Sequence, residues 1–318
     1  MKTPILLIIF NRPDTTARVF AEIRAAKPKQ LFIAADGPRS EAEQELCSTT
    51  RSIVDRVDWE CEVKTLFRDK NLGLGFGVDS AITWFFENVE QGIILEDDCL
   101  PSPSFFEFCE AMLEKYKNNE NVGIISGDNF IQEDILEEIN PNKDEYYFIR
   151  PLYLWGWATW RRAWDKHDLE MRNWPAFQRD HYLERAFKSR NVSRLYNDLF
   201  EFLYSKGTRV WDIPWFFSCL TNNMLCLVPP RNLVSNIGII GTHSTEESTL
   251  NNIKIVPISI ETLQHPEEVA VNIEVEDLFL KYTFVDRFSY RILLIKILKV
   301  LKIRDLARSI YRKFNLKF

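Results

Sequence analysis

The chain has 318 residues and a formal net charge of −6, with 46% apolar and 13% aromatic residues. This composition is typical of a globular protein with a well-buried core, and we expect no nucleic acid among its partners. No apolar run approaches the length of a bilayer span, and the apolar start at 4–10 is too short for a signal sequence. The six cysteines show no C-x-x-C spacing, which argues against a zinc ribbon and favours a reduced, cytoplasmic protein.

Strand-like and helix-like segments alternate over the first 130 residues. Short apolar runs predict buried strands, and longer segments with apolar residues three or four positions apart predict helices. In chain order we expect strands at 5–10, 31–35, 61–67, 92–96 and 122–126. We expect a first helix beginning at Asp14 or Thr15 and further helices over 41–57, 75–88 and 105–116. Alternation at this pitch predicts an α/β fold of Rossmann-like type, a mostly parallel sheet flanked by helices.

The rest of the chain is less regular. It carries an aromatic stretch at 154–160, a helical segment near 181–205 and a strand near 224–228. No repeat or low-complexity linker divides it, so we expect one composite domain over residues 1–280. Residues 281–318 form a separate tail.

Three adjacent carboxylates, Glu96-Asp97-Asp98, end the apolar run 92–95. Packed at the end of a buried strand they repel one another, and a hard divalent cation would offset that cost. Mg²⁺ and Mn²⁺ favour oxygen ligands and commonly bridge a protein carboxylate to substrate phosphate. The alternative is a polar turn followed by helix-capping residues.

Other polar residues follow the preceding strands. They are Asn11 and Arg12 after the first strand, Asp36 and Gly37 after the second, and Arg68, Asn71 and Gly73 after the third. Because the carboxyl ends of parallel strands share one edge, these residues are expected to converge on the acidic triplet, where open α/β sheets bind ligands. Taken singly, each is more typical of a turn or a loop.

Four segments thus stand in a fixed order: Phe10-Asn11-Arg12-Pro13, Asp36-Gly37, Asn71-Leu72-Gly73 and Glu96-Asp97-Asp98. This order resembles the nucleotide-sugar domain of GT-A glycosyltransferases. It is similar to the N-acetylglucosaminyltransferase I type and its bacterial relatives, in which a Glu-Asp-Asp motif precedes a proline and a Phe-Phe helix, here Pro101 and Phe105-Phe106. The resemblance continues to about residue 245, in Ser126-Gly127-Asp128-Asn129, Gly156-Trp157, Trp211-Asp212 and Gly241-Thr242-His243.

The resemblance implies a role for each matching residue. Asp98 matches the direct ligand of Mn²⁺ (or Mg²⁺), and His243 matches a histidine near the metal and the donor diphosphate, although a structural histidine is the alternative. The implied donor-binding set is Phe10, Asn11, Arg12, Asp36, Arg68, Asn71, Gly73, Glu96 and Asp97. Asp212 matches the catalytic base, although this chain has one aspartate in Trp211-Asp212-Ile213-Pro214-Trp215 where the family's named member has two.

The resemblance also implies a division of labour and a reaction. Residues 1–130 would form the donor half and 131–280 the acceptor half, with Asp128 and Trp157 as acceptor-binding residues. The tryptophans near Trp157 are otherwise core. The implied enzyme is an inverting hexosyltransferase that moves a sugar from a nucleotide-sugar, most simply a UDP-sugar, to a hydroxyl of a glycan or lipid-linked acceptor, as in polysaccharide biosynthesis. A carboxylate base takes the acceptor proton and the metal acts as a Lewis acid.

Two other functions stay open. A nucleotidyltransferase that makes nucleotide sugars shares the sheet and the acidic site, but usually has a glycine-rich loop after its first strand, which Phe10-Asn11-Arg12-Pro13-Asp14 lacks. A catalytically inactive carbohydrate-binding or scaffold protein would have no need to keep Glu96, Asp97, Asp98 and Asp212 together.

The tail differs from the rest in charge. Residues 281–318 hold eleven Lys or Arg and two acids, a net charge of +9, so the other 280 residues carry −15. Basic residues at three- or four-residue steps among apolar ones predict an amphipathic helix on an anionic membrane surface, which would place the protein at the inner face of the cell membrane. The alternative is a helix packed on the acidic body or on a second subunit.

Overall fold

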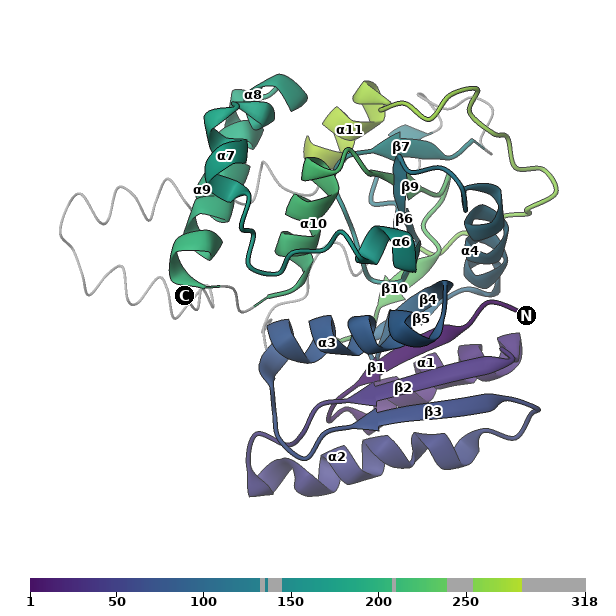
Figure 1. Ribbon diagram of the computed structural model, residues 1–318. Coiled ribbons are helices and arrows are strands. Elements are labelled where there is room, and N and C mark those ends of the chain that lie inside the picture. The colour runs from purple at the N-terminus through teal and green to yellow at the C-terminus, as the bar shows by residue number, and fades with distance from the viewer. Residues whose placement is uncertain (132–134, 137–144, 208–209, 239–253, 282–318) are drawn as a thin grey trace.

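The computed structural model describes residues 1–131, 135–136, 145–207, 210–238 and 254–281 (Figure 1). These residues contain a mixed eight-stranded sheet with the strand order β3-β2-β1-β4-β8-β6-β9-β7. Its strands are β1 (Ile5–Ile9), β2 (Gln30–Ala35), β3 (Glu62–Phe67), β4 (Gln91–Glu96), β6 (Val122–Ser126), β7 (Tyr147–Ile149), β8 (Trp157–Trp160) and β9 (Leu225–Val228). Six of them run in one direction, and β7 and β8 run against them.

Helices cover both faces of this sheet. In chain order they are α1 (Pro13–Ala26), α2 (Gln44–Arg51), α3 (Gly73–Asn88), α4 (Pro103–Lys115), α6 (Arg161–Trp164), α7 (Trp174–Arg179), α8 (Tyr182–Ala186), α9 (Arg190–Lys206), α10 (Asp212–Thr221) and α11 (Ile273–Leu280). This confirms the predicted α/β class with a mostly parallel sheet flanked by helices.

The period-two alternation of the strands divides the core. On β1, Ile5 and Leu7 pack on the side of α1 and α4, whereas Leu6 packs on the side of α3, α10 and α11. A third apolar cluster joins α7, α8 and α9 to the outer side of α10, well away from β1–β3 (Figure 1). The helical layer that carries α10 is therefore held from two sides.

The strands of the first half match their predicted ranges closely, and two other details differ. The segment predicted as one helix over 41–57 is broken into a 3₁₀ turn (Glu41–Glu43), α2 and a second 3₁₀ turn (Ser52–Arg56). The helix expected to start at Asp14 or Thr15 begins at Pro13, because proline suits the first turn, where its missing N–H costs nothing.

The second half holds strands that the alternation does not reveal. The aromatic stretch forms β8, which lies antiparallel between β4 and β6 with all four residues buried. A separate two-stranded sheet pairs β5 (Cys99–Pro101) with β10 (Val234–Asn236). β8 thus ties the second half to residues 91–94 of β4, and β10 ties it to the segment that follows β4.

Within the described ranges, no helix combines the length and the apolar character needed to cross a membrane. The predicted amphipathic helix lies at 281–318, of which the structure describes only Lys281. His243 also lies outside the described residues, so its predicted role stays a prediction.

Candidate active site

The acidic triplet and Asn11-Arg12 meet at one edge of the sheet. β1 and β4 are parallel neighbours, with Ile8 opposite Glu96 in the register. The residues that follow the two strands therefore leave the sheet side by side. The convergence expected from parallel strand ends is confirmed for these two segments.

An arginine bridges the two aspartates of the triplet. Arg12 Nη1 lies 2.6 Å from Asp98 Oδ2 and 3.4 Å from Asp97 Oδ1. The buried Asp97 also accepts a hydrogen bond from the backbone N–H of Phe10 at 3.1 Å through its other oxygen. Asp97 thus fixes the chain after β1 to the chain after β4, which is a structural task for a residue predicted to bind the donor.

Burial and nearby negative charge raise the pKa values of Glu96 and Asp97. Burial is the main reason that the pKa of Glu96 is raised to about 8; the charges of the nearby carboxylates follow, in the order Asp98, Asp97 and Asp212. Burial and then the charge of Asp98 raise the pKa of Asp97 to about 7, against the opposing effects of Arg12 and the Phe10 N–H. Glu96 and Asp97 resist ionisation because they are buried and lie near other carboxylates, so added positive charge would stabilise their ionised forms.

Asp98 fits the donor set of a hard cation. The β5–β10 pair brings Gly238 beside it, because Ile237 N donates to Asp98 O at 2.8 Å. A Cβ on Gly238 would stand only 2.5 Å from Asp98 Oδ2, so the glycine leaves a space at this oxygen that a side chain would fill. A partly buried carboxylate with an oxygen next to such a space suits Mn²⁺ or Mg²⁺, in competition with Arg12.

No group of three or more His, Cys, Asp or Glu side chains in the described part of the chain is arranged to hold a metal ion. A Mg²⁺ site in which one or two carboxylates act together with substrate phosphates needs no such cage. The residues present fit that second type, with Asp98 as the protein ligand.

Asp36 is occupied by the backbone of the loop before α3. Its two oxygens accept from Leu72 N at 2.9 Å, from Gly73 N at 3.0 Å and from its own neighbour Gly37 N at 3.0 Å. Gly73 has a φ of +80°, a conformation that glycine adopts without strain. Asp36 therefore organises the loop, and its predicted contact with a base or ribose would compete with these bonds.

Asn71 and Asn11 are also engaged with the protein. Asn71 donates to Gly37 O at 2.7 Å and accepts from Gly73 N at 3.1 Å, so it supports the same loop. Asn11 donates to Glu43 Oε1 at 3.1 Å. Their predicted donor contacts are not tested by these bonds, but Asn71 already positions backbone and Asn11 already binds the side chain of Glu43.

Arg68 keeps an unused donor. Its Nη2 donates to Ser80 Oγ at 2.8 Å, while its buried Nη1 has no hydrogen-bond partner within the described residues. Burial lowers the pKa of Arg68, and Asp36 opposes that shift. A buried donor without a partner is costly, and it is what a binding site leaves for a ligand. Sequence reasoning missed Arg51, whose Nη2 ties Asp36 O (3.1 Å) to Arg68 O (2.6 Å).

Asp212 is the first residue of α10. Its charge adds to the rise in the pKa of Glu96, after burial and the charges of Asp98 and Asp97. The side chain of Asp212 is exposed to solvent, yet burial among neighbouring atoms raises its pKa. The bond from Ile213 N to Asp212 Oδ1, at 2.9 Å, opposes that rise. A raised pKa makes a carboxylate a stronger base.

The two predicted acceptor-binding residues lie inside the protein. Trp157 is 1% exposed and stacks on Trp211 with ring centroids 5.7 Å apart, and Asp128 is fully buried. Asp128 Oδ2 accepts from Trp155 N at 3.0 Å. Neither side chain offers surface to an acceptor here, so direct contact does not fit the described structure. Trp157 instead belongs to the core, which was the alternative for this tryptophan cluster.

One constellation was not expected from the sequence. His167 Nε2 lies 2.9 Å from Asp79 Oδ1, and its Nδ1 lies 3.4 Å from Ser218 Oγ. Ser218 is buried and donates to Pro214 O at 2.9 Å, so it is no exposed nucleophile. The three side chains instead join α3 to α10, the helix that carries Asp212. The 88 residues between Asp79 and His167 conceal this contact in the sequence.

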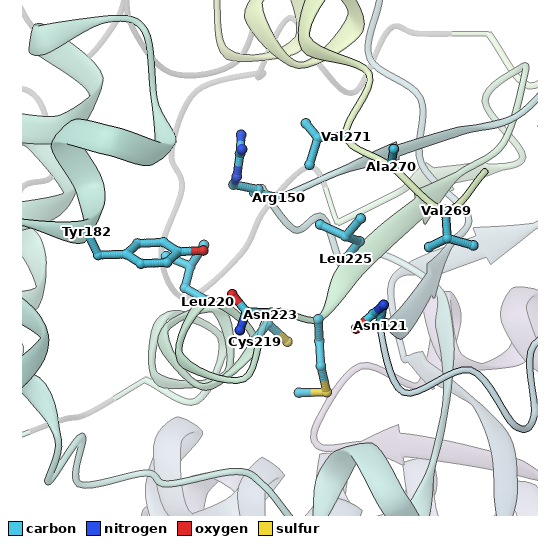
Figure 2. A pocket seen from close by; sticks show the side chains of 11 residues that line it. Asn121, Arg150, Tyr182, Cys219, Leu220, Asn223, Leu225, Val269, Ala270 and Val271 are labelled. Carbon is cyan, nitrogen blue, oxygen red and sulfur yellow. The ribbon is translucent and has the colours of Figure 1, made fainter.

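A pocket of about 320 Å³ lies away from the acidic triplet (Figure 2). Its lining includes Asn121, just before β6, and Leu225, the first residue of β9. These are the amino ends of strands parallel to β4, so the pocket opens at the opposite edge of the sheet from the triplet. Figure 2 shows Arg150 and Tyr182 at this pocket, and Arg150 pairs with the buried Glu276 of α11 at 2.6 Å.

No protein-family model and no curated protein matches the sequence. Among solved structures, a fragment of S. aureus TarS matches at 11% identity and a TM-score of 0.29, covering 39% of this chain; the chain spans only 34% of that fragment. The inositol-1-phosphate CTP transferase of T. maritima matches at 9% identity and 0.34, covering 70% of this chain and 84% of that one. Mouse xyloside xylosyltransferase 1 matches at 14% and 0.32, with coverage of 70% and 84%. TM-scores of 0.29 to 0.34 are too low to identify a shared fold or activity.

Proposed function

We propose that this protein is a metal-dependent glycosyltransferase of the GT-A type that takes a sugar from a nucleotide-sugar donor. The observation that carries the proposal is the meeting of Arg12 and the acidic triplet at the carboxyl edge of β1 and β4. Ligands of open α/β sheets bind at this edge. The unused buried donor of Arg68, which directly follows β3 at the same edge of the sheet, supplies a further group for a nucleotide.

In this proposal Asp98 would hold Mn²⁺ or Mg²⁺, which when bound supplies Lewis-acid stabilisation to the departing nucleoside diphosphate. Glu96 and Asp97 shape the donor side, and Asp97 does so by fixing Phe10. Asp212 takes the proton of the acceptor hydroxyl as the hydroxyl oxygen attacks the anomeric carbon and the bond from that carbon to the nucleoside diphosphate breaks. A single base on the acceptor side gives inversion without a covalent intermediate.

The experiment is a thermal-shift and hydrolysis panel of nucleotide sugars, with UDP-sugars first, with and without Mn²⁺. A ligand that binds only the folded state raises the midpoint of unfolding. We expect a Mn²⁺-dependent shift and slow hydrolysis of one UDP-sugar, both lost in Asp98→Ala. A requirement for a nucleoside triphosphate would favour the nucleotidyltransferase. No response to any nucleotide would favour a binding or scaffold protein.

We also propose that the basic tail at 281–318 holds the enzyme on an anionic membrane, where a lipid-linked acceptor is available. The support is its net charge of +9 beside a body of −15. The full chain should sediment with phosphatidylserine vesicles at low salt and be released at high salt, because salt screens the attraction. If the full chain does not bind such vesicles at low salt, the membrane proposal fails in favour of a tail helix that packs on the acidic body or on a second subunit.

A further inference from the structure

Arg12 places a positive charge where a divalent cation would bind. Its Nη1 contacts Asp98 Oδ2 at 2.6 Å, the same oxygen that borders the space beside Gly238. It also reaches Asp97, and its charge opposes the raised pKa of Glu96. The charge of one guanidinium therefore partly offsets the negative charge of all three carboxylates.

The backbone of Arg12 is anchored, whereas its side chain has room to move. Arg12 O accepts from Thr16 N at 3.1 Å and from the buried Thr16 Oγ1 at 2.6 Å, at the start of α1. The side chain keeps 25% of its surface exposed. In the described part of the chain, both ion pairs use Nη1 alone. Because the backbone of Arg12 is anchored and its side chain touches the aspartates through one atom, the guanidinium can leave Asp97 and Asp98 without unfolding α1.

Arg12 and a divalent cation compete for Asp98. Two cations a few ångströms apart repel strongly in a partly buried site, so a metal that binds alone must displace the guanidinium and lose its ion pairs. A nucleoside diphosphate brings negative charge of its own, which can accompany the metal and offset that repulsion. The bare metal and the metal with its nucleotide should thus differ in affinity for this site.

We propose that Arg12 is an internal counter-cation, which keeps the acidic triplet from holding a divalent cation until a nucleoside diphosphate arrives with it. This inference rests on the proposed function in taking Asp98 as the metal ligand. It makes Arg12 a residue that sets the order of binding, in addition to its place in the donor-binding set.

The test measures Mn²⁺ binding without substrate, by the loss of the free-Mn²⁺ electron paramagnetic resonance signal on titration. Arg12→Gln removes the charge but keeps a hydrogen-bond donor, and Arg12→Lys keeps the charge. Arg24→Gln is the matched control, since Arg24 lies on the same helix and pairs with Asp58 at the surface. We expect Arg12→Gln to bind Mn²⁺ alone about 10- to 100-fold more tightly than wild type. Arg12→Lys and Arg24→Gln should stay near the wild-type value.

A second measurement keeps the test valid if Arg12→Gln folds less well than wild type. Unfolding of Arg12→Gln and of wild type is followed with EDTA and with Mn²⁺, and Mn²⁺ should raise the midpoint more in Arg12→Gln. Equal Mn²⁺ affinity and equal shifts in both proteins, with wild type still binding Mn²⁺ in the presence of UDP, would overturn the role of Arg12 and leave the metal site standing. If UDP brings no Mn²⁺ binding to wild type, the proposed function fails as well.

Discussion

The two halves of the sheet bring their polar residues to the candidate site by different means. In the half that carries β1 to β4, β1 and β4 each end directly before the residues of interest, so that the strand itself delivers Arg12 and the triplet. In the other half, Asp212 begins a helix that is positioned by packing between distant segments, among them the Trp157–Trp211 stack and the His167–Ser218 contact. One site is therefore built from local and long-range determinants together.

This difference between the two halves predicts which substitutions affect ligand binding alone and which also affect the stability of the fold. Residues after a parallel strand can change while the strand keeps its ladder of hydrogen bonds. Residues that position α10 have both a functional and a structural role, so their substitution should lower both activity and stability. Four substitutions can break or sharpen this distinction.

The largest effect is expected for Asp212→Asn. The variant keeps the shape of the side chain but removes the base, so turnover should fall by about 10²–10⁴-fold while UDP binding with Mn²⁺ is kept. Steady-state kinetics and calorimetry with UDP measure the two quantities separately. A variant that loses UDP affinity but keeps turnover would place Asp212 in the donor site or in the fold.

Trp157→Ala should act on stability. Trp157 is 1% exposed and packs against Trp211 and Trp215, so its truncation leaves a cavity and should cost about 3–5 kcal/mol of unfolding free energy. Urea unfolding measures this loss. A variant of unchanged stability with a raised KM for the acceptor would restore Trp157 to the acceptor-binding set.

The same contrast explains how much the sequence could predict. Short apolar runs such as 92–95, alternating with helix-like segments, predict buried parallel strands, so the strands β1 to β4 and the convergence of Arg12 with Asp98 follow from the sequence pattern. The antiparallel insertion of β8 between β4 and β6 leaves no such pattern, because all four of its residues are buried. Gly238 reaches Asp98 across 140 residues, through β5–β10 pairing that a three-residue strand does not announce.

Asp128→Asn should change how stability depends on pH. Burial raises the pKa of Asp128 to about 8, opposed by the Trp155 N–H, and its Oδ1 has no partner within the described residues. An unfolded aspartate has a pKa near about 4, so the folded state holds the extra proton between these values. Stability gained from Asp128 is therefore full below about pH 4 and is lost as the pH rises toward about 8, by up to about 1.4 kcal/mol per pH unit.

Urea unfolding at several pH values measures this slope in wild type and variant. The neutral amide has no proton to lose, so Asp128→Asn should gain on wild type as the pH rises from about 4 to about 8. The other raised carboxylates titrate in both proteins and cancel in the comparison. Parallel curves for the two proteins would mean that Asp128 is ionised in the fold.

The smallest effect is expected for Gly238→Ala, which tests the space beside Asp98. The new Cβ would stand 2.5 Å from Asp98 Oδ2, so the carboxylate must shift, and Mn²⁺-dependent UDP binding should weaken by about tenfold. Gly207→Ala is the matched control, because Gly207 at the end of α9 has a φ of +76° and open space around it. It should lose about 1 kcal/mol of stability through backbone strain and keep its UDP affinity. Calorimetry and thermal unfolding of both variants separate the two effects. Unchanged UDP binding in a folded Gly238→Ala protein would move the metal away from this oxygen of Asp98.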